Sequence, residues 1–465
     1  MKIMFISLGC DKNLVDTEMM LGILSEQGCS FTDDENEADI IVVNTCCFIG
    51  DAKEESINTL LEMGRLKETG NCRLLVAAGC LAQRYRDEIQ SEIPEVDVII
   101  GTMAIDKIGE IVRLYRERTA QDEKSRQNQV AGAGQEQGAR FMEDINARPV
   151  YGKKRVVTTG GHYAYLKIAE GCNKHCTYCI IPKVRGDFRS IPMESLVAEA
   201  ESLVSGGVRE LILVAQETTL YGVDLYGEKK LPELLRRLAK IPGIYWIRLL
   251  YCYPEEITPE LVETIAAESK ICHYLDIPIQ HASDSILKRM GRRTTQQQLR
   301  DKIAFLREKI PDICLRTTLI TGFPGENEQD FEQLLQFVDE MEFDRLGVFT
   351  YSPEEDTPAA SFPDQIPEEI KEDRRAQIME LQQDIAFEKA EEMTGRVIPV
   401  MIEGKVADEN AYVGRTYKDA PGVDGLVFVN TQEELMTGDF VPVVITGSYE
   451  YDLIGEISYE NEFTE

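Results

Sequence analysis

Three cysteines in one short stretch place the strongest constraint on how this chain can fold. Cys172, Cys176 and Cys179 are separated by three and then two residues, and the apolar run Tyr163–Ala169 leads directly into them. A loop with this spacing brings three thiolates onto one small object. Zinc usually takes four protein ligands, whereas three soft thiolates suit an iron–sulfur cluster with one open iron. Three buried thiols, or a zinc site completed from elsewhere in the chain, are the alternatives.

The spacing resembles the signature of the radical S-adenosylmethionine enzymes, whose aromatic residue before the third cysteine is present here as Tyr178. In that family the three cysteines hold a 4Fe–4S cluster. Its open iron takes the amino and carboxylate groups of S-adenosylmethionine. The resemblance therefore makes Cys172, Cys176 and Cys179 cluster ligands and Tyr178 a cofactor-binding residue.

Residues 1–118 alternate between strand and helix patterns, which predicts an α/β domain with an open parallel sheet. We expect strands at Lys2–Leu8, Asp39–Asn44, Arg73–Ala78 and Val96–Ile100. We expect helices at Val15–Gln27, Ala52–Thr69, Arg84–Ile93 and Ile105–Arg118.

A cysteine follows each of the first three of these strands: Cys10, Cys46 and Cys80. The carboxyl ends of parallel strands share one edge, where ligands bind, so these cysteines should meet and hold a second cluster. Cys47 rivals Cys46, but neighbouring strand residues point in opposite directions. Unrelated buried thiols are the alternative for this set. We interpret the five remaining cysteines as ordinary buried side chains: Cys29, Cys72, Cys252, Cys272 and Cys314.

The sequence around these cysteines is similar to the N-terminal domain of the methylthiotransferases. The matching stretches are Leu8-Gly9-Cys10-Asp11-Lys12-Asn13-Leu14-Val15-Asp16, Asn44-Thr45-Cys46 and Gly79-Cys80. In that family three cysteines at these positions hold an auxiliary 4Fe–4S cluster. The resemblance thus implies two clusters, with Cys10, Cys46 and Cys80 as the ligands of the second.

Residues 119–157 are expected to be a linker, because Gln121–Arg140 is rich in Gln, Gly, Ala and charge and has no apolar period. A segment that the substrate orders is the alternative. Residues 158–389 then repeat strand and helix about six times, which predicts a partial (β/α)6 barrel. Its expected strands are Tyr163–Ala169, Glu210–Ala215, Tyr245–Leu250, Tyr274–Pro278, Cys314–Ile320 and Arg345–Tyr351. Its expected helices include Met193–Ser205, Leu231–Lys240, Pro259–Glu268, Gln296–Lys309 and Glu328–Glu340.

Active residues of such barrels lie at the C-terminal ends of the strands, so residues there are candidate contacts of S-adenosylmethionine. They are Gln216, Gln280, Gly322 and Pro324, with Glu217 and His281 beside them. An ordinary turn explains Gly322–Gly325 equally well, and His281 could be a helix-capping or otherwise hydrogen-bonded residue. Arg185 and Arg189 could meet a carboxylate of the cofactor or the substrate, or could be solvated loop charges.

The C-terminal residues 390–465 follow a long helix, Pro367–Glu391, whose Pro367 suits a first helical position. Five short strands are expected: Val397–Glu403, Tyr412–Thr416, Gly425–Val429, Phe440–Gly447 and Tyr451–Ile457. They predict a small OB-like barrel and resemble the TRAM domain of methylthiotransferases. Residues 393–465 carry 14 acidic and 4 basic residues, and the whole chain has a net charge of −32. Nucleic-acid binding favours a basic surface, so this charge favours a basic protein partner.

The local motifs resemble the methylthiotransferase branch that modifies an aspartate of small-subunit ribosomal protein S twelve. The motifs are Ala164–Cys172, Ala215–Gly222, Gly414–Tyr417 and Val423–Gly425; Glu217 stands where many relatives have aspartate. This branch adds a methylthio group to the aspartate β-carbon. An electron from the first cluster cleaves S-adenosylmethionine to a 5′-deoxyadenosyl radical, which removes the β-hydrogen. The auxiliary cluster carries the sulfur, which another S-adenosylmethionine methylates before its attachment.

The resemblance further implies an electron donor such as flavodoxin or ferredoxin. The chain opens without a secretory signal and has no apolar run that could span a bilayer, so we expect a cytoplasmic protein without a membrane partner. Two other functions stay open. The chain could be a tRNA adenosine methylthiotransferase, or a non-catalytic iron–sulfur sensor that binds ribosomes.

Overall fold

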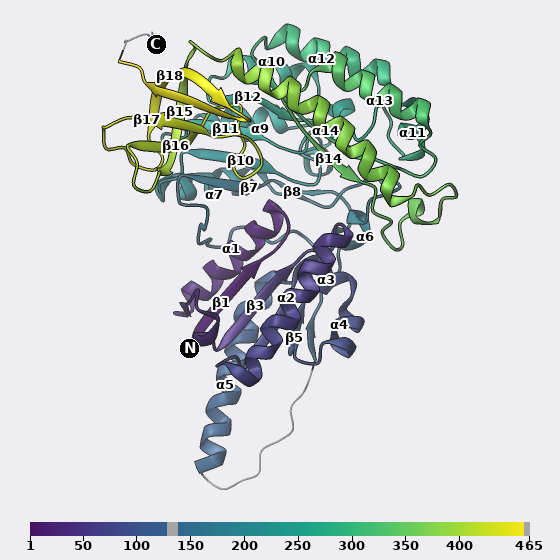
Figure 1. The fold of residues 1–465 in the computed structure, drawn as a ribbon. Helices are drawn as coiled ribbons and strands as arrows, with labels where there is room; N and C mark the ends of the chain where they lie inside the picture. Colours follow the sequence, from purple (N-terminus) through teal and green to yellow (C-terminus); the bar gives the residue numbers. More distant parts are fainter. Residues whose placement is uncertain (128–137, 460–465) are drawn as a thin grey trace. The chain divides into compact units, whose positions relative to one another are not determined.

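The structure, a computed structural model, describes residues 1–127 and 138–459. The chain forms two compact units. The first contains residues 1–158, 169–175 and 179–191, and the second contains residues 159–168, 176–178 and everything from residue 192 onward. Figure 1 shows the order of the elements along the chain.

The first unit is built on a six-stranded sheet with the order β2-β1-β3-β4-β5-β6, in which every neighbouring pair is parallel. The strands are β1 Lys2–Ser7, β2 Ser30–Phe31, β3 Ile40–Thr45, β4 Leu74–Ala78, β5 Val98–Ile100 and β6 Ala139–Phe141. β3 and β4 are buried along their whole length. A strand buried on both faces reads as a continuous apolar run, which is why the sequence predicted these strands well.

Helices cover both faces of this sheet. Alternate residues of β3 enter two separate cores, with Ile41 and Val43 on one face and Ile40 and Val42 on the other. The first core is closed by α2 (Gly50–Thr69), α3 (Gly79–Arg84) and α4 (Arg86–Glu92), and the second by α1 (Asp11–Glu26) and α5 (Ile108–Gln127). The short turns η1 (Glu35–Glu37) and η2 (Ile105–Lys107), the strands β8 (Ala169–Glu170) and β9 (Arg189–Ser190), and the helix α6 (Ile181–Arg185) complete this unit.

The structure departs from the linker expected at residues 119–157. Helix α5 continues to Gln127, and β6 adds a sixth strand to the sheet beside β5. Farther on, Arg155 forms an ion pair with the buried Glu18 of α1 at 2.6 Å, and Thr158 donates to the same carboxylate. These contacts make the segment after residue 138 part of the first unit. Residues 128–137 of the expected linker lie outside the described residues.

The second unit contains a six-stranded parallel sheet with the order β14-β13-β12-β11-β10-β7. Its strands are β7 Tyr163–Lys167, β10 Glu210–Val214, β11 Trp246–Leu249, β12 Ile271–Asp276, β13 Cys314–Thr321 and β14 Arg345–Thr350. The helices between them are α7 Met193–Ser205, α8 Val223–Tyr226, α9 Leu231–Ala239, α10 Pro259–Ala267, α11 Asp284–Arg289, α12 Gln296–Lys309 and α13 Glu328–Met341, with η3 Pro254–Glu256 and η4 Pro358–Ser361 as short turns. The sheet stays open between β7 and β14, which confirms the partial (β/α)6 barrel.

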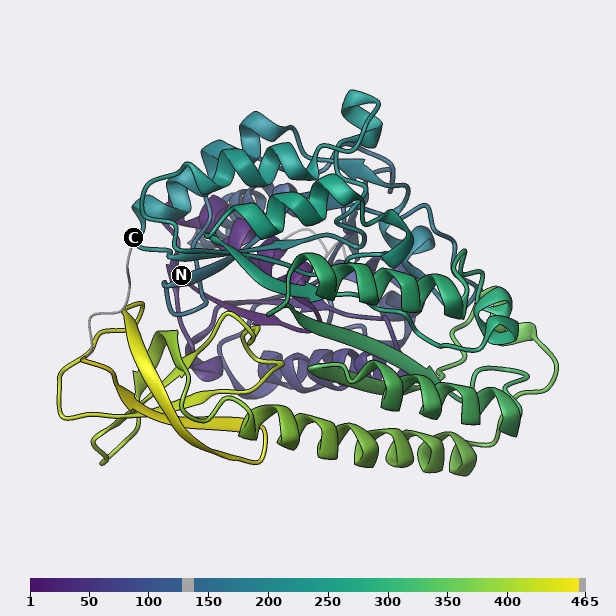
Figure 2. The same cartoon turned by 90° about the horizontal axis from the view of Figure 1, so that it is seen from above.

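Helix α14 (Glu368–Glu391) packs beside α13 and leads into the C-terminal barrel (Figure 2). Pro367 is the N-cap of this helix rather than its first helical residue. The barrel is closed in the order β15-β16-β17-β19-β18, from β15 Val397–Lys405, β16 Ala411–Arg415, β17 Val427–Asn430, β18 Phe440–Tyr449 and β19 Asp452–Ile457. This confirms the small β-barrel expected there.

Buried ion pairs fasten the C-terminal barrel to the large sheet within the second unit. Glu210 of β10 accepts from Arg248 at 2.7 Å and from Arg415 of β16 at 2.8 Å. All three side chains are at most 1% exposed. Met401 and Phe440 of the small barrel also join the apolar core of the large sheet. The small barrel and the large sheet thus share one buried ion-pair network and one apolar core within this unit.

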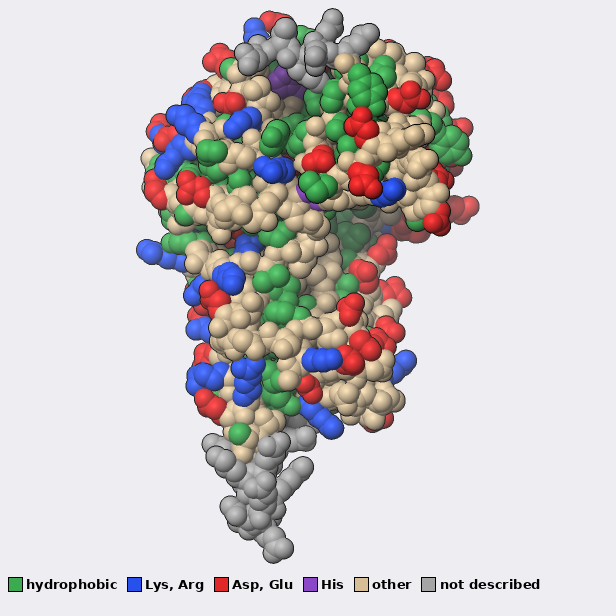
Figure 3. All heavy atoms as spheres, turned by 90° about the vertical axis from the view of Figure 1, so that its left-hand side faces the viewer, with side chains coloured by type: hydrophobic (Ala, Val, Ile, Leu, Met, Phe, Trp, Pro, Cys, Tyr) green, Lys and Arg blue, Asp and Glu red, His purple; other side chains and the backbone are tan. Residues whose placement is uncertain are grey.

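Acidic and basic side chains are interspersed with hydrophobic ones on the face drawn in Figure 3, and no single basic stripe crosses that face. None of the helices in the described parts of the chain combines the length and the apolar character that crossing a bilayer requires.

Candidate functional site

The structure brings Cys10, Cys46 and Cys80 together in the first unit. They follow β1, β3 and β4, which are neighbours in the sheet. Burial, followed by the charges of Cys80 and Cys10, raises the pKa of Cys46 to about 12. Burial also raises the pKa of Cys80, and Cys10 adds to this shift. Each thiol thus lies within electrostatic range of the others, as the strand-end argument predicted.

Two glycines bring the backbone close to these thiols. A Cβ added to Gly9 would lie 2.7 Å from the Sγ of Cys46, and one added to Gly79 would lie 2.3 Å from Oδ1 of Asn44. Both glycines have positive φ angles, of 85° and 89°, which other residues adopt only with strain. The three cysteine loops can therefore approach one another only because glycine precedes Cys10 and Cys80.

Asn13 joins the three cysteine loops by hydrogen bonds. Its amide nitrogen donates to the carbonyl oxygens of Leu8 and Thr45, both at 3.0 Å. Its oxygen Oδ1 lies 3.8 Å from the Sγ of Cys80. The Thr45 hydroxyl donates to the carbonyl of Ala78 at 2.6 Å, which ties the second loop to the third. The positions of the three thiols are thus held by a buried polar framework.

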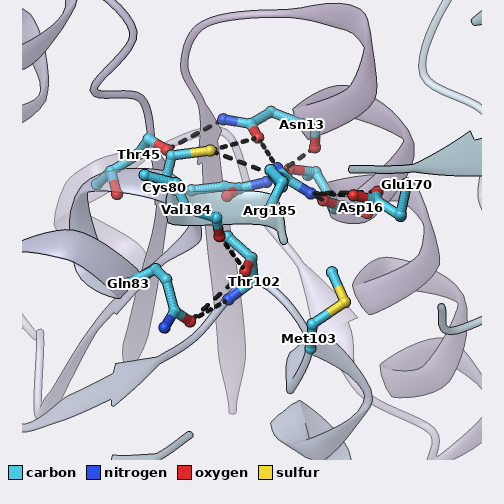
Figure 4. Close-up of polar contacts among 12 residues, drawn as sticks. Asn13, Asp16, Thr45, Cys80, Gln83, Thr102, Met103, Glu170, Val184 and Arg185 are labelled. Atoms are coloured by element: carbon cyan, nitrogen blue, oxygen red, sulfur yellow. Dashed lines mark hydrogen bonds and ion pairs between the residues drawn. The ribbon is translucent and has the colours of Figure 1, made fainter. Parts of the chain in front are cut away.

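Arg185 lies at the centre of this framework (Figure 4). Its Nε donates to the Sγ of Cys80 at 3.3 Å, and Nη1 forms ion pairs with Asp16 at 2.9 Å and Glu170 at 3.3 Å. Nη2 donates to Oδ1 of Asn13. Burial alone would lower the pKa of Arg185, but the charges of Cys80, Glu170 and Asp16 raise it well above its ordinary value. The side chain is a fixed cation next to a candidate cluster ligand.

This placement corrects both readings of Arg185, whereas the two readings of Arg189 stay predictions. Arg185 is only 1% exposed and already paired, so it is neither a solvated charge nor open to a new carboxylate. Arg189 donates to the carbonyl oxygens of Asp187 and Arg185 and to the side chain of Asn146. Both arginines therefore hold the segment that follows the cysteine loop.

Cys47 lies in the same apolar core as Cys80. Burial and then the charge of Cys80 raise the pKa of Cys47. A Cβ on Gly9 would meet Cys46, not Cys47, and the choice of Cys46 over Cys47 stays a prediction. Of the other five cysteines, Cys72, Cys252, Cys272 and Cys314 are buried, whereas Cys29 is only partly buried and accepts from Arg116.

The second candidate set lies on the loop between β8 and α6. Cys172 follows Glu170 by two residues, and Cys179 stands just before Ile180, the N-cap of α6. Within the second unit, Cys176 contacts the hydroxyl of Tyr253 at 3.4 Å. The three cysteines lie within eight residues of chain, and a positive φ of 53° at His175 turns the backbone between them.

Tyr178 and the turn Gly322–Gly325 meet in the second unit. The ring of Tyr178 packs edge-on against Phe323, with ring centres 6.4 Å apart. The carboxylate of Glu326 holds the turn by accepting from the backbone N–H of Gly322 at 2.9 Å and of Phe323 at 3.3 Å. Pro324 follows within this turn. The backbone of Gly322, with φ of 69°, is therefore fixed next to the aromatic residue of the cysteine loop.

The remaining candidate contacts follow β10 and β12, two strands of the same sheet that are separated by β11. Gln216 follows β10, and its Oε1 is buried without a hydrogen-bond partner among the described residues. Gln280 follows β12 with a φ of 72°, a strained backbone of the kind found at functional sites. His281 accepts at Nδ1 from the backbone of Ser283, the N-cap of α11, and is fully buried. His281 is thus a buried, hydrogen-bonded residue just before α11, whose N-cap has no side-chain capping bond.

The sequence analysis did not identify Asn13, Asp16, Glu170 or Tyr253 as part of the site. Asn13 and Asp16 stand three residues apart on α1, so they share one helix face. Their spacing, three and six residues after Cys10, could have indicated that both side chains lie near this cysteine. Glu170 and Tyr253 follow strands that the sequence predicted, but only the packing shows that they reach Arg185 and Cys176.

The donor set is of the kind that holds iron–sulfur clusters. Three convergent thiols, a glycine cradle and a buried cation that donates to sulfur fit such a group.

Three family descriptions match successive parts of the chain. Residues 2–101 match the uncharacterized protein family UPF0004, residues 166–338 the radical SAM superfamily, and residues 394–457 the TRAM domain. The solved structure of TsrM from Kitasatospora setae, a radical S-adenosylmethionine methyltransferase, superposes with a TM-score of 0.52 at 14% identity. The match covers 85% of this chain and 78% of the TsrM chain. At this identity the likeness concerns the fold alone.

Curated relatives match over nearly the full length. The ribosomal protein uS12 methylthiotransferase RimO of Lachnoclostridium phytofermentans is 59% identical, over 98% of this chain and 99% of the relative. That of Acetivibrio thermocellus is 50% identical over 99% of both chains. With three matching domains in the same order and identity of this extent, the chain belongs to the RimO family of radical S-adenosylmethionine methylthiotransferases.

Proposed function

We propose that this protein adds a methylthio group to the β-carbon of an aspartate in ribosomal protein uS12, as the names of its relatives indicate for those proteins. The observation that carries the proposal is the identity of 59% over 98% of this chain. An unactivated carbon has no proton that a side-chain base can remove, so the reaction needs radical chemistry.

The six cysteines supply the ligands in this proposal. Cys172, Cys176 and Cys179 hold the cluster that binds S-adenosylmethionine, and Cys10, Cys46 and Cys80 hold the auxiliary one. When bound, these groups supply the radical and the sulfur-transfer chemistry that no side chain provides. The chain's own residues orient them.

Several of these orienting roles follow from contacts described above. Gly9 lets its loop approach Cys46, Asn13 fixes the three thiol loops, and Arg185 donates to the Cys80 sulfur. Tyr178, Gln216, Gln280, Gly322 and Pro324 are the candidate contacts of S-adenosylmethionine. Gln216 has an unpartnered buried oxygen that can accept from an amino or hydroxyl group.

The charge of the C-terminal barrel favours the protein substrate over tRNA. Of its four basic residues, Arg415 is buried in ion pairs and Lys418 lies 3.5 Å from Asp344. Arg396 and Lys405 are exposed, together with six acids: Asp408, Glu409, Glu433, Glu434, Glu450 and Glu456. Such a surface repels phosphate and attracts a basic protein.

Two partners and a location complete the proposal. The reaction needs an electron donor, such as flavodoxin or ferredoxin. Its substrate is uS12, free or on the ribosome, which places the reaction in the cytoplasm.

Peptide mass mapping of uS12 tests the proposal. We expect one aspartate to carry a methylthio group in cells that contain the chain, and to lack it after deletion. Complementation with Cys10→Ala should fail, whereas Cys29→Ala, a cysteine outside both sets, should restore the modification. Unmodified uS12 in both strains, with a methylthio group on tRNA adenosine instead, would establish the tRNA activity. If the purified protein does not cleave S-adenosylmethionine under reducing conditions, a non-catalytic sensor would be indicated.

A further inference from the structure

The face of the large sheet on which the small barrel packs, called here the inner face, is filled over most of its width. Strand residues on this face share one apolar core with Met401 of the small barrel, and each is at most 7% exposed. They come from β10, β11, β12 and the start of β13: Ile212, Val214, Trp246, Cys272, Tyr274 and Cys314.

The inner face opens at its edge, over β13 and β14. Side chains alternate along a strand, so Thr318 and Ile320 lie on the same face as Cys314. In the pairing of the two strands, Thr318 lies beside Gly347, and Ile320 lies beside Phe349. Thr318, Ile320 and Gly347 are partly exposed, and Phe349 is 52% exposed. This edge of the sheet is therefore not covered by the described residues.

Gly347 leaves room above the middle of β14. A Cβ added to this glycine would meet no heavy atom of the described residues within 4 Å. Its backbone belongs to a regular strand and has no left-handed φ, so neither a turn nor close packing requires a glycine there. A glycine inside a strand often marks a place where a ligand or another backbone approaches closely.

The open edge borders the candidate cofactor site within the second unit. Ile320 and Tyr178 pack against the same apolar cluster, which contains Phe323. Tyr178 belongs to the cysteine loop, and Phe323 belongs to the turn Gly322–Gly325. Phe349 is the strand neighbour of Ile320. The exposed ring therefore lies one strand farther out than the candidate contacts of S-adenosylmethionine.

Acidic side chains follow this open edge. Glu355 and Asp356 come shortly after β14 in the chain, and both are exposed. The whole chain carries a net charge of −32. Carboxylates repel the phosphates of a nucleic acid and attract a basic polypeptide. The charge thus favours a basic protein as the molecule that covers the edge.

We propose that Phe349 and the space over Gly347 bind the segment of uS12 that carries the target aspartate. The inference rests on the proposed function and names the surface that the substrate contacts. The reaction requires the aspartate β-carbon to lie beside S-adenosylmethionine, so the neighbouring uS12 residues lie on the adjoining part of the sheet. Phe349 offers an apolar surface to their side chains, and Gly347 lets their backbone approach the strand.

Equilibrium binding of purified uS12 to the reconstituted full-length protein tests this surface without turnover. Gly347→Val fills the open space with a side chain that strands favour. Phe349→Ala removes the apolar contact. We expect each change to weaken uS12 binding roughly 10- to 100-fold. Neither should alter the affinity for S-adenosylmethionine.

Turnover gives a second readout that a general loss of structure would not produce. Under reducing conditions both variants should still cleave S-adenosylmethionine, but should deliver less methylthiolated uS12 for each molecule cleaved. The reason is that the cofactor site stays intact while the substrate segment is misplaced. A wild-type ratio of modified uS12 to cleaved S-adenosylmethionine in both variants would contradict the inference.

Two matched controls exist in the same chain. Gly404 of β15 also leaves open space, because an added Cβ would meet no described atom within 4 Å. Leu114 of α5 is another exposed apolar side chain, at 44%. Gly404→Val and Leu114→Ala should bind uS12 like the wild type. If Gly347→Val does not fold, Phe349→Ala still carries the test, since losing an exposed side chain changes stability little.

The outcomes distinguish the inference from the function on which it rests. Wild-type affinity of both variants for uS12 would overturn the inference and leave the proposed function intact. An equal loss of affinity for S-adenosylmethionine would assign the edge to the cofactor and also overturn the inference. A wild-type protein that binds tRNA and no uS12 would overturn the proposed function, and the inference with it.

Discussion

The Nε of Arg185 donates a hydrogen bond to the Sγ of Cys80 over 3.3 Å, deep in the first unit. The same guanidinium pairs with Glu170, which stands two residues before Cys172. One buried cation thus connects a thiol of the auxiliary set with the strand that enters the cysteine loop. The two cysteine sets, 92 residues apart between Cys80 and Cys172, share a structural support.

Replacing Arg185 should destabilise the first unit strongly. Arg185→Gln leaves Asp16 and Glu170 buried without their cation, and removing one partner of a buried ion pair costs about 3–5 kcal/mol. We expect a large decrease of the urea midpoint. Lys183→Gln, an exposed change on the same helix, should alter stability by about 0.5 kcal/mol or less. Equal midpoints for the two variants would refute the central role of Arg185.

Adding one methyl group at Gly9 should prevent assembly of the auxiliary cluster. Gly9→Ala places a Cβ 2.7 Å from the Sγ of Cys46, on a backbone with φ of 85°. The strain of the left-handed backbone costs about 1–2 kcal/mol. Gly28→Ala has the same kind of strain at φ of 70°, but its Cβ meets no atom within 4 Å.

Iron analysis after anaerobic reconstitution separates the clash from the strain. We expect Gly9→Ala to lose about half of the iron bound per chain, since one of two equal clusters fails to form. Gly28→Ala should keep the full amount. Full iron content in Gly9→Ala would show that the loop can move away from Cys46.

The cysteine positions could be predicted from the sequence because simple rules govern them. Long buried strands such as Ile40–Thr45 appear as apolar runs, and the carboxyl ends of parallel strands meet at one edge. Cys10, Cys46 and Cys80 therefore had to converge. The six strands of the second sheet and the five of the small barrel could also be predicted, because each is an apolar run bounded by turn residues.

The polar contacts of the site could not be predicted in this way. A sequence shows that Arg185 is charged, but not that Asp16, 169 residues away, is its buried partner. The strand β6 has only three residues, which is too short for a periodic signal.

The hydroxyl of Tyr253 should tune the cluster that Cys176 binds. Hydrogen bonds to the sulfurs of a cluster influence its reduction potential, and this hydroxyl lies 3.4 Å from the Cys176 Sγ. Tyr253→Phe keeps the aromatic ring and removes only the hydroxyl, so one hydrogen bond of about 1 kcal/mol is lost. We expect a lower reduction potential, measured by potentiometric titration with electron paramagnetic resonance. The measurement is made in a Cys10→Ala background, in which only the cluster of Cys172, Cys176 and Cys179 forms. If Tyr253→Phe leaves the reduction potential of that cluster unchanged, the Tyr253 hydroxyl does not act on the Cys176 sulfur.

Acid should loosen the attachment of the small barrel to the large sheet through Glu210. Burial alone would raise the pKa of this carboxyl, but Arg415 and Arg248 outweigh the burial and lower it below 4.5. A lowered pKa in the folded state means that the group stabilises the fold above its unfolded pKa. The stabilisation decreases as the pH falls from about 4.5 through the lower pKa of the folded state.

Glu210→Gln tests this pH dependence at one buried position. The variant leaves Arg248 and Arg415 without their shared carboxylate, so it should be less stable by about 3–5 kcal/mol at neutral pH. Below about pH 4.5 the wild type loses the contribution of Glu210, and the difference between the two proteins should narrow. Thermal unfolding from pH 3 to 7 measures both curves. Glu194→Gln is the control, because Glu194 is exposed and its pKa is also lowered. If the difference in thermal stability between the wild type and Glu210→Gln stays constant across these pH values, Glu210 is not the ionised centre of this network.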